Sequence, residues 1–320
     1  MNRHNRATSR RPAPTNTRAA LATFALLLLS TVAYAQVRAE VKHAVAFTPA
    51  VAATQIGAPP LKEAVVFGQK IKYVDVGSGP VVVLLHGLGG NSSNWAFNFA
   101  ALSAKYRVIA PDQIGFGHSD KPLINYRVGT YADFLDKFLE GLNVEHASLV
   151  GNSMGGWVAA LYAIKYPKRV ERIVLVDAAG FAPPKEFDLS TLSGLNPSTR
   201  EQARYLAGLV FFNPLFKTDA AVDATLAGRI SAGDGYTIQS LVESIYRGED
   251  MLDGKLSAIK QPTLIIWGKD DGLLPLARDG EKYRKEMPSA QFVVFEQCGH
   301  VPQVEKAAEF NAAVLKFLSQ

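Results

Sequence analysis

The stretch Val150-Gly151-Asn152-Ser153-Met154-Gly155-Gly156 lies between a short apolar run and a run with helical character. A strand, a sharp turn and a helix in this order, with Gly-x-Ser-x-Gly at the turn, predict a nucleophile elbow. Such a turn places Ser153 at a positive φ and requires small residues two positions away on either side. A glycine-rich turn without a catalytic role fits the same short pattern. Other motifs in the chain are therefore needed to distinguish the two interpretations.

Apolar runs and helical runs alternate on both sides of this stretch. Alternation of this kind predicts an α/β fold with a mostly parallel central sheet and helices on both faces. An antiparallel hairpin opens the predicted sheet. Strands are predicted at 64–67, 71–76, 80–85, 107–110, 147–150, 172–176, 262–267 and 291–295, and helices at 92–105, 131–142, 157–166, 275–287 and 304–318. Ligands bind such sheets beyond the carboxyl ends of the strands, where Ser153 lies.

The alternation stops between residues 182 and 254, where we expect helices over 200–211, 219–230 and 237–247 and no strand. The motif Ser198-Thr199-Arg200-Glu201 predicts a capping box at the start of the first of these helices. We interpret residues 182–254 as a helical lid inserted between the two parts of the core, 64–181 and 255–320.

The lid carries the candidates for substrate contact. Its apolar run from Leu209 to Phe216 includes Phe211 and Phe212, which we select as substrate-binding residues together with Asn152 of the elbow. Packing between lid and core is the favoured alternative explanation of this run. Four lid arginines are candidates either for binding a carboxylate or for surface salt bridges: Arg200, Arg204, Arg229 and Arg247.

The first 35 residues have the composition of an export signal. Five arginines and no acidic residue accompany an apolar run, Ala19 to Val32, that leads into the cleavage pattern Ala33-Tyr34-Ala35. That run is shorter than the roughly 20 residues that span a bilayer comfortably. We therefore expect a periplasmic or secreted protein, with an uncleaved segment that holds the chain at the membrane as the alternative. Residues 36–63 predict a linker or N-terminal arm.

Charge and cysteine content narrow the partners. The chain has 320 residues and a net charge of +5, and the five arginines of the signal segment account for all of that charge. No basic patch then indicates a nucleic-acid partner. Cys298 is the only cysteine, so no intramolecular disulfide can form. The glycine-rich segment 112–120 lacks the phosphate-loop pattern, and we read it as structural. We expect a small-molecule substrate and neither a cofactor nor a metal.

A serine nucleophile needs a base and an acid that orients the base. In this architecture the acid and then the histidine follow the serine along the chain. His300 is the only histidine after Ser153 and follows the last predicted strand. Asp271, in the turn after strand 262–267, is the expected acid, and Asp270 and Asp177 are the alternatives.

The oxyanion of an acyl transfer needs two backbone donors. The N–H of Met154, directly after the serine, and the N–H of Leu88, in the turn that begins His86-Gly87, occupy the expected positions. His86 itself comes before the serine, and we assign it to that turn. His118 and His146 fall in predicted loops.

From about Ala64 onward, the chain resembles the α/β-hydrolase fold superfamily. The motifs that carry the resemblance are His86-Gly87, Gly115-x-Gly117-x-Ser119, the elbow, Gly268-x-x-Asp271 and Gly299-His300, in the family's order. Residues 151–156 and the pattern Cys298-Gly299-His300-x-x-Gln303-x-Glu305 are similar to the carbon–carbon bond hydrolases of aromatic meta-cleavage pathways. Haloalkane dehalogenases and epoxide hydrolases carry aspartate at the position of Ser153, which argues against both.

The sequence predicts an exported serine hydrolase that forms an acyl-enzyme on Ser153. We expect its substrate to be a carboxylic ester with an apolar acyl part. The first alternative is carbon–carbon bond hydrolysis of meta-cleavage type by the same residues. The second is a binding protein of this fold that holds a ligand without turnover. The sequence does not indicate an oligomeric state.

Overall fold

We describe residues 59–183 and 194–320 in a computed structural model of the chain. The predicted signal segment, nearly all of the predicted arm and residues 184–193 of the predicted lid lie outside these ranges. Within the described residues, no helix has the length and apolar content needed to cross a membrane.

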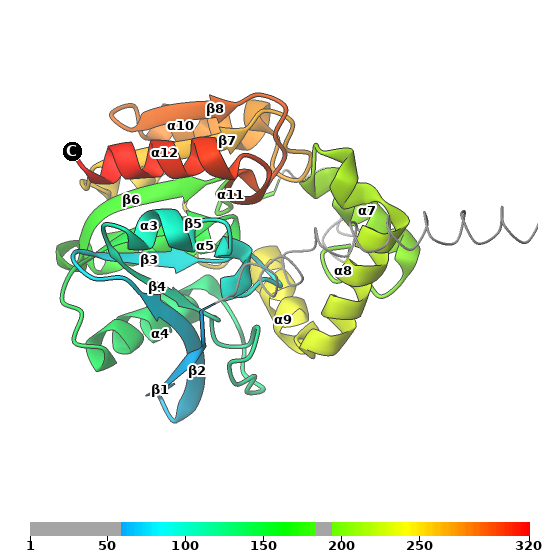
Figure 1. Cartoon of the computed structure of the whole chain (residues 1–320), viewed down its shortest axis with the longest axis horizontal. Coiled ribbons are helices and arrows are strands. Elements are labelled where there is room, and N and C mark those ends of the chain that lie inside the picture. The colour runs from blue at the N-terminus through cyan, green and yellow to red at the C-terminus, as the bar shows by residue number, and fades with distance from the viewer. Residues whose placement is uncertain (1–58, 184–193) are drawn as a thin grey trace, which may run out of the picture. The chain divides into compact units, whose positions relative to one another are not determined.

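In the described residues, eight strands form one sheet in the order β1-β2-β4-β3-β5-β6-β7-β8 (Figure 1). β1 pairs antiparallel with β2, β2 pairs antiparallel with β4, and the other neighbours are parallel. This confirms the predicted mostly parallel sheet and its opening hairpin. The strands are β1 (Lys62–Val66), β2 (Gln69–Val76), β3 (Val81–Leu85), β4 (Arg107–Pro111), β5 (Ala147–Asn152), β6 (Val170–Val176), β7 (Thr263–Gly268) and β8 (Gln291–Phe295). β1 begins inside the predicted arm, two residues earlier than expected.

The central strands are buried on both faces, as their continuous apolar runs predict. In β3, Val83 and Leu85 belong to one core cluster and Val82 and Leu84 to the other. Helices α4 (Val128–Gly141), α5 (Met154–Lys165) and α10 (Glu281–Glu286) cover the first cluster, whereas α3 (Phe99–Ser103) and α12 (Ala307–Leu318) cover the second.

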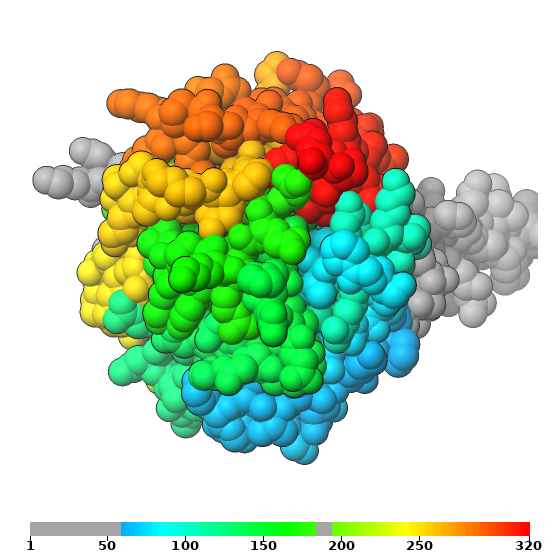
Figure 2. Space-filling model, turned by 90° about the vertical axis from the view of Figure 1, so that its left-hand side faces the viewer, coloured from blue at the N-terminus to red at the C-terminus, as the bar shows by residue number. Residues whose placement is uncertain are grey.

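Segments far apart in the chain meet on the second face. Asn98, which precedes α3, donates from its side chain to Oδ1 of Asn311 in α12 at 2.8 Å. Figure 2 shows this neighbourhood from the side away from α7 and α8, with the red residues of α12 beside the cyan residues of the first half of the core.

Three predicted helices are interrupted. Residues 92–105 form a 3₁₀ turn, Ser92–Trp95, and then α3, and the Asn98 side chain between them bonds across the core to Asn311. The predicted helix 275–287 is a π turn followed by α10, and the closing helix is broken at Lys306, where φ is −129° and ψ is 43°. The pieces are Ser92–Trp95 and α3, Leu276–Gly280 and α10, and α11 (Pro302–Glu305) and α12.

Between β6 and β7 the described residues contain helices and no strand. These are α7 (Arg200–Val210), α8 (Asp219–Ala232) and α9 (Gly235–Tyr246), which lie to the right of the sheet in Figure 1. We call residues 194–254 the helical insertion. Its first helix is capped one residue later than predicted, because the Thr199 side chain, and not Ser198, accepts from the N–H of Gln202.

The strand order creates a crevice at the carboxyl edge of the sheet. From β3 the chain passes to β4 on one side, and it later returns to β5 on the other side of β3. Loops leaving neighbouring strands in opposite directions open a crevice at their carboxyl ends, where ligands bind in open α/β sheets. The loop after β3 and the elbow after β5 border this crevice.

Candidate active site

The loop after β5 has the geometry of the predicted elbow. Ser153 lies between the end of β5 and the first residue of α5, with φ 56° and ψ −120°. This backbone conformation is unusual for a residue with a side chain and persists only where its surroundings hold it. The N–H of Ser153 donates to the carbonyl of Val176 at 2.9 Å, and its carbonyl accepts from Trp157 at 3.1 Å. The serine is thereby fixed at the carboxyl edge of the sheet.

Gly151 and Gly155 allow β3, β5 and α5 to approach one another. A Cβ on Gly151 would lie 2.2 Å from the carbonyl oxygen of Gly155, and a Cβ on Gly155 would lie 2.1 Å from that of Leu85. The obstructing atoms are backbone atoms of packed elements, so they cannot move aside independently. Packing therefore requires both glycines of the motif.

His300 and Asp271 meet beside the elbow. His300, in the loop between β8 and α11, is buried, and its Nδ1 lies 2.7 Å from Oδ2 of Asp271. The N–H groups of Leu273 and Leu274 donate to Oδ1 of Asp271 at 2.8 and 2.9 Å, which fixes the carboxylate. An ionised Asp271 keeps the proton on Nδ1 and leaves Nε2 as an acceptor. No group of the described residues hydrogen-bonds to this buried Nε2.

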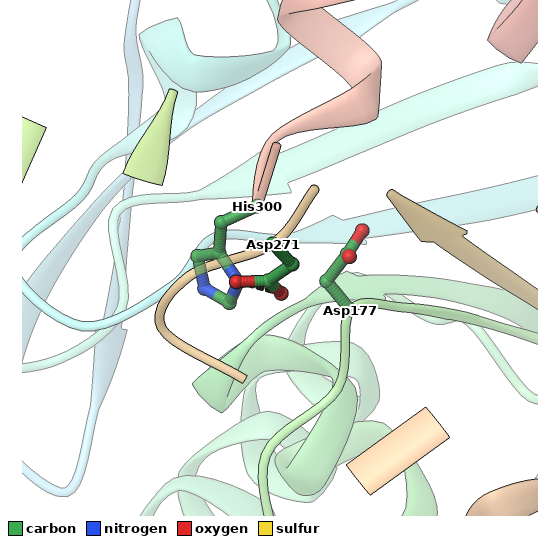
Figure 3. Close-up of side chains that lie close together, drawn as sticks. All are labelled: Asp177, Asp271 and His300. Carbon is green, nitrogen blue, oxygen red and sulfur yellow. Dashed lines mark hydrogen bonds and ion pairs between the residues drawn. The ribbon is translucent and has the colours of Figure 1, made fainter. Parts of the chain in front are cut away.

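The alternative acids do not contact the imidazole in this way. Asp270 is exposed. Asp177, at the end of β6, is fully buried, and its Oδ1 accepts from the N–H of Gly268 at 2.8 Å. In the view of Figure 3, Asp271 lies between His300 and Asp177.

His86 belongs to the turn after β3. Its Nε2 accepts from the N–H of Gln113 at 3.0 Å, and its Nδ1 lies 2.8 Å from the carbonyl oxygen of Gly87. Burial lowers the pKa of His86, so the ring is neutral near pH 7. The other two histidines of the core contact loop groups: His118 contacts Asp112, and His146 contacts the carbonyl of Lys168.

The glycine-rich segment 112–120 is held by the buried side chain of Asp112. That carboxylate accepts from the N–H of Ser92 at 2.7 Å and from the N–H of His118 at 2.8 Å. A Cβ on Gly117 would lie 2.3 Å from the same carboxylate. Gly117 also borders the cavity described below, so the segment shapes its rim.

The two expected oxyanion donors lie at the serine. Leu88 and Met154 line the same cavity as Ser153. Met154 is the first residue of α5, and its N–H therefore has no acceptor within the helix. The loop that carries Leu88 passes against the serine, since a Cβ on Gly87 would lie only 3.1 Å from Cβ of Ser153.

A cavity of about 420 Å³ opens onto Ser153 and His300. Its other walls come from α7, α8 and α9 of the helical insertion and from the loops after β6 and β7. The lining side chains are mostly apolar, and among them are Trp157, Phe181, Leu206, Val210, Leu241 and Ile245. A volume of this order holds a small organic molecule.

Two of the three predicted substrate-binding residues line the cavity, and one does not. Phe211 lines the cavity, but Phe212 does not, and 39% of its surface is exposed. Because the chain extends at the end of α7, successive side chains point in opposite directions. Asn152 lines the cavity, yet its amide nitrogen already donates to the carbonyls of Val176 at 3.2 Å and His300 at 3.0 Å. Asn152 thus holds the histidine loop.

Of the four arginines considered in the sequence, Arg229 alone lines the cavity. It donates to the carbonyl of Gly89 at 2.5 Å and forms an ion pair with the buried Asp234. The other three form surface ion pairs: Arg200 with Asp223, Arg204 with Asp219 and Arg247 with Glu249.

Glu305 joins the histidine loop to the helical insertion, a role that the sequence did not reveal. Its Oε2 accepts from the N–H of Gly299 at 2.7 Å, and its Oε1 accepts from the N–H of Asn213 at 2.7 Å. The glutamate was visible only as part of a resemblance motif. Its partners lie six residues before it in one case and 92 residues before it in the other, beyond the reach of any local pattern.

Residues 80–307 match the family described as alpha/beta hydrolase fold. The match spans most of the chain and includes the elbow and the loops of Asp271 and His300. The chain belongs to this family. The sheet order and the helices on both faces agree with that membership.

This α/β hydrolase is similar to proteins of different named activities. A 2-hydroxymuconate semialdehyde hydrolase of a Pseudomonas species is 32% identical over 267 residues, which cover 81% of this chain and 94% of that protein. A variant of a meta-cleavage product hydrolase from Pseudomonas fluorescens is 30% identical with a TM-score of 0.72, over 81% of this chain and 97% of the other. A bacterial membrane phospholipase A is 29% identical with a TM-score of 0.72, and the match covers 92% of this chain and 97% of that protein.

Proposed function

We propose that this α/β hydrolase is a serine hydrolase that attacks a small carbonyl compound with Ser153. One observation carries the proposal: the buried imidazole of His300 is held by Asp271 at 2.7 Å and borders the same cavity as the elbow serine. The fold alone hosts many functions, so the proposal rests on this site.

The groups account for a complete acyl transfer. Ser153 Oγ attacks the carbonyl carbon while His300 Nε2 takes the hydroxyl proton, and Asp271 stabilises the imidazolium that results. The N–H groups of Leu88 and Met154 bind the developing oxyanion. The bond to the leaving group then breaks, and His300 returns the proton to that group. Water next attacks the acyl-enzyme by the same route and releases the acid and Ser153.

Hydrolysis of a carbon–carbon bond of meta-cleavage type is our first candidate reaction. It is supported by the relatives named as 2-hydroxymuconate semialdehyde hydrolase and meta-cleavage product hydrolase, which match most of both chains. This reverses the order expected from the sequence, which placed ester hydrolysis first. A carbon leaving group must depart as a stabilised enolate, so the substrate needs a second carbonyl conjugated to the bond that breaks, and His300 then protonates carbon.

Carboxylic ester hydrolysis is the second candidate. Two observations favour it. The cavity walls are mostly apolar and suit an acyl chain. The match to the membrane phospholipase A also extends over 92% of this chain, compared with 81% for the meta-cleavage product hydrolase. The alcohol oxygen would receive the proton of His300 in this case.

A direct comparison of substrates tests the proposal. The purified protein is assayed with 2-hydroxymuconate semialdehyde and, in parallel, with p-nitrophenyl esters of rising chain length. We expect kcat/KM for 2-hydroxymuconate semialdehyde to exceed every ester value. The reverse order would select ester hydrolysis, and turnover of neither substrate would favour a binding protein.

Labelling with a fluorophosphonate probe tests the nucleophile separately. We expect the intact protein to react and Ser153→Ala not to react. An unlabelled intact protein, or labelling that survives this substitution, would overturn the assignment of Ser153.

We also propose that the protein is exported. The arginine-containing start, the apolar run from Ala19 to Val32 and the pattern Ala33-Tyr34-Ala35 support this proposal. Fractionation of expressing cells with mass spectrometry of the N-terminus tests it. We expect a periplasmic or secreted chain that begins at Gln36. A full-length chain in the cytosol contradicts export, and a full-length chain in the membrane fraction indicates an uncleaved anchor.

A further inference from the structure

Asp177 is a second buried acid behind the proposed triad, and its position is rigid. Asp177 directly follows β6 and has φ 42°. Its N–H donates to the carbonyl of Ile266 at 2.9 Å, and its Oδ1 accepts from the N–H of Gly268 at 2.8 Å. It has no exposed surface. Asp177 thus has a strained backbone conformation, and its surroundings hold the fully buried carboxyl group in one orientation.

The carboxyl group of Asp177 belongs to a cluster with Asp271 and His300. Atoms of the three side chains lie within 4.8 Å of one another (Figure 3). No donor among the described residues reaches Oδ2 of Asp177, although that oxygen is buried. A buried carboxylate oxygen without a donor is costly, and a second ionised carboxylate beside it raises that cost.

A proton on Asp177 removes the repulsion between the two carboxylates and gives the buried Oδ2 a hydrogen-bonding role. The pKa of Asp177 is raised well above its ordinary value. Burial is the largest cause, and the negative charge of Asp271 and a hydrogen bond with the Asp271 side chain add to it. The negative charge of Glu305 acts in the same direction. Since Oδ1 already accepts from Gly268, the proton belongs on Oδ2, where it turns an orphan acceptor into a donor.

Asp271 can accept one more hydrogen bond. An ionised carboxylate offers about four lone-pair sites. Leu273 and Leu274 occupy two sites on Oδ1, and His300 occupies one on Oδ2. A further donor from Asp177 fills the set and restrains the carboxylate from the side away from the imidazole.

We infer that Asp177 is a positioning residue, a neutral carboxylic acid that donates a hydrogen bond from Oδ2 to Asp271 and keeps that carboxylate directed at His300. The inference rests on the proposed function, because it assigns Asp177 to the same triad. Asp177 keeps its proton throughout the reaction, and no bond to it forms or breaks. It is therefore distinct from the triad acid, which must be ionised.

The pH dependence of kcat/KM tests the inference in Asp177→Asn and Asp177→Ala. An asparagine amide can donate to Asp271 and accept from Gly268, so we expect Asp177→Asn to keep activity within about threefold of the original near pH 7. Alanine removes the donor, and we expect a loss of about ten- to a hundredfold. Asp271→Asn serves as the comparison that removes the essential charge.

The alkaline side of the profile separates positioning from simple structural support. The titratable groups around Asp177 are Asp271, His300, Glu305 and Cys298. Ionisation of Asp177 at high pH removes the donor and adds a repelling charge, so kcat/KM of the original protein should fall there. Asparagine cannot ionise, and Asp177→Asn should keep its activity over that range. A difference infrared spectrum should also show the band of a protonated carboxylic acid lost in Asp177→Asn.

Two results would overturn the inference. Asp177→Asn as inactive as Asp271→Asn would make Asp177 the charged acid of the triad. If the alkaline limb of the kcat/KM profile of Asp177→Asn superimposes on that of the original protein, Asp177 does not cause the alkaline fall in activity. This result is decisive even if Asp177→Ala does not fold. Failure of the proposed function appears separately, as activity that survives Ser153→Ala.

Discussion

The backbone N–H of His300 donates to the carbonyl oxygen of Val210 at 2.7 Å, so the expected base is hydrogen-bonded to the end of α7. One residue earlier, the carbonyl of Leu209 accepts from the N–H of Gly272 at 3.0 Å, directly after the expected acid. The helical insertion is therefore docked on both loops that hold the acid and the base. An opening of the insertion at this end would break bonds to both loops.

Replacement of Glu305 should loosen this docking. Its carboxylate accepts from Gly299 and Asn213, and Glu305→Ala leaves both N–H groups without this acceptor. We expect a loss of about 2 kcal/mol in the free energy of unfolding and about a tenfold fall in kcat/KM. Amide hydrogen exchange at Gly299 and Asn213 should become faster. Glu309→Ala, an exposed change on α12, is the control. Unchanged exchange in Glu305→Ala would contradict the docking role.

Asp271→Asn should lower kcat by about ten-thousandfold, because an amide facing Nδ1 no longer favours the tautomer that leaves Nε2 free. The buried position of Asp271 and its 2.7 Å contact with His300 motivate this prediction. Asp270→Asn, one residue earlier and exposed, should stay within about twofold of the original. Steady-state kinetics on both variants provides the measurement, and equal effects of the two changes would refute the assignment.

Gly155→Ala should prevent normal folding of the elbow, since its Cβ would lie 2.1 Å from the carbonyl oxygen of Leu85. We expect destabilisation of at least about 3 kcal/mol and loss of activity. Gly208 gives a matched control, because it lies exposed within α7 with no atom within 4 Å of an added Cβ. Gly208→Ala should stabilise the protein by about 0.5–1 kcal/mol. Urea denaturation compares the two, and a tolerated Gly155→Ala would show that the crowding can relax.

Asp177→Asn should change how stability depends on pH. The raised pKa of Asp177 means that the folded protein keeps a proton that the unfolded chain releases above about pH 4. The free energy of unfolding of the original protein therefore falls as pH rises from there towards the folded-state pKa, by up to about 1.4 kcal/mol per pH unit. Asp177→Asn lacks this fall and should gain stability relative to the original between about pH 4 and pH 7. Urea denaturation across this range measures it, and parallel pH slopes would count against a proton on Asp177.

The fold followed from local patterns, because each strand of the parallel part contains a short apolar run and these runs alternate with helical segments. The elbow was also legible, since Gly151, Ser153 and Gly155 meet within one turn. The interruptions of the helices were not. Beside the first interruption, Asn98 bonds to Asn311, 213 residues later, and a contact of this range leaves no local pattern in the sequence.

The candidate site was predictable in its residue types and less so in its contacts. Chain order identified Ser153, Asp271 and His300 as a set. In the structure Ser153 and His300 line one cavity, and Asp271 contacts His300. Phe211 lines the cavity and Phe212 does not, because the side of an extended segment that faces the cavity depends on packing and not on apolarity. Asp177 was considered only as a rival acid, since the contact between two buried carboxyl groups that are far apart in the chain leaves no local pattern in the sequence.

The position of the helical insertion between β6 and β7 also affects when the site comes into being. A chain synthesised as far as the insertion has the strand and turn of Ser153 but lacks the loops of Asp271 and His300, which follow β7 and β8. The serine hydroxyl then has no base and is a weak nucleophile. With the proposed roles of these residues, we expect Ser153 to become reactive only after the last strands have joined the sheet.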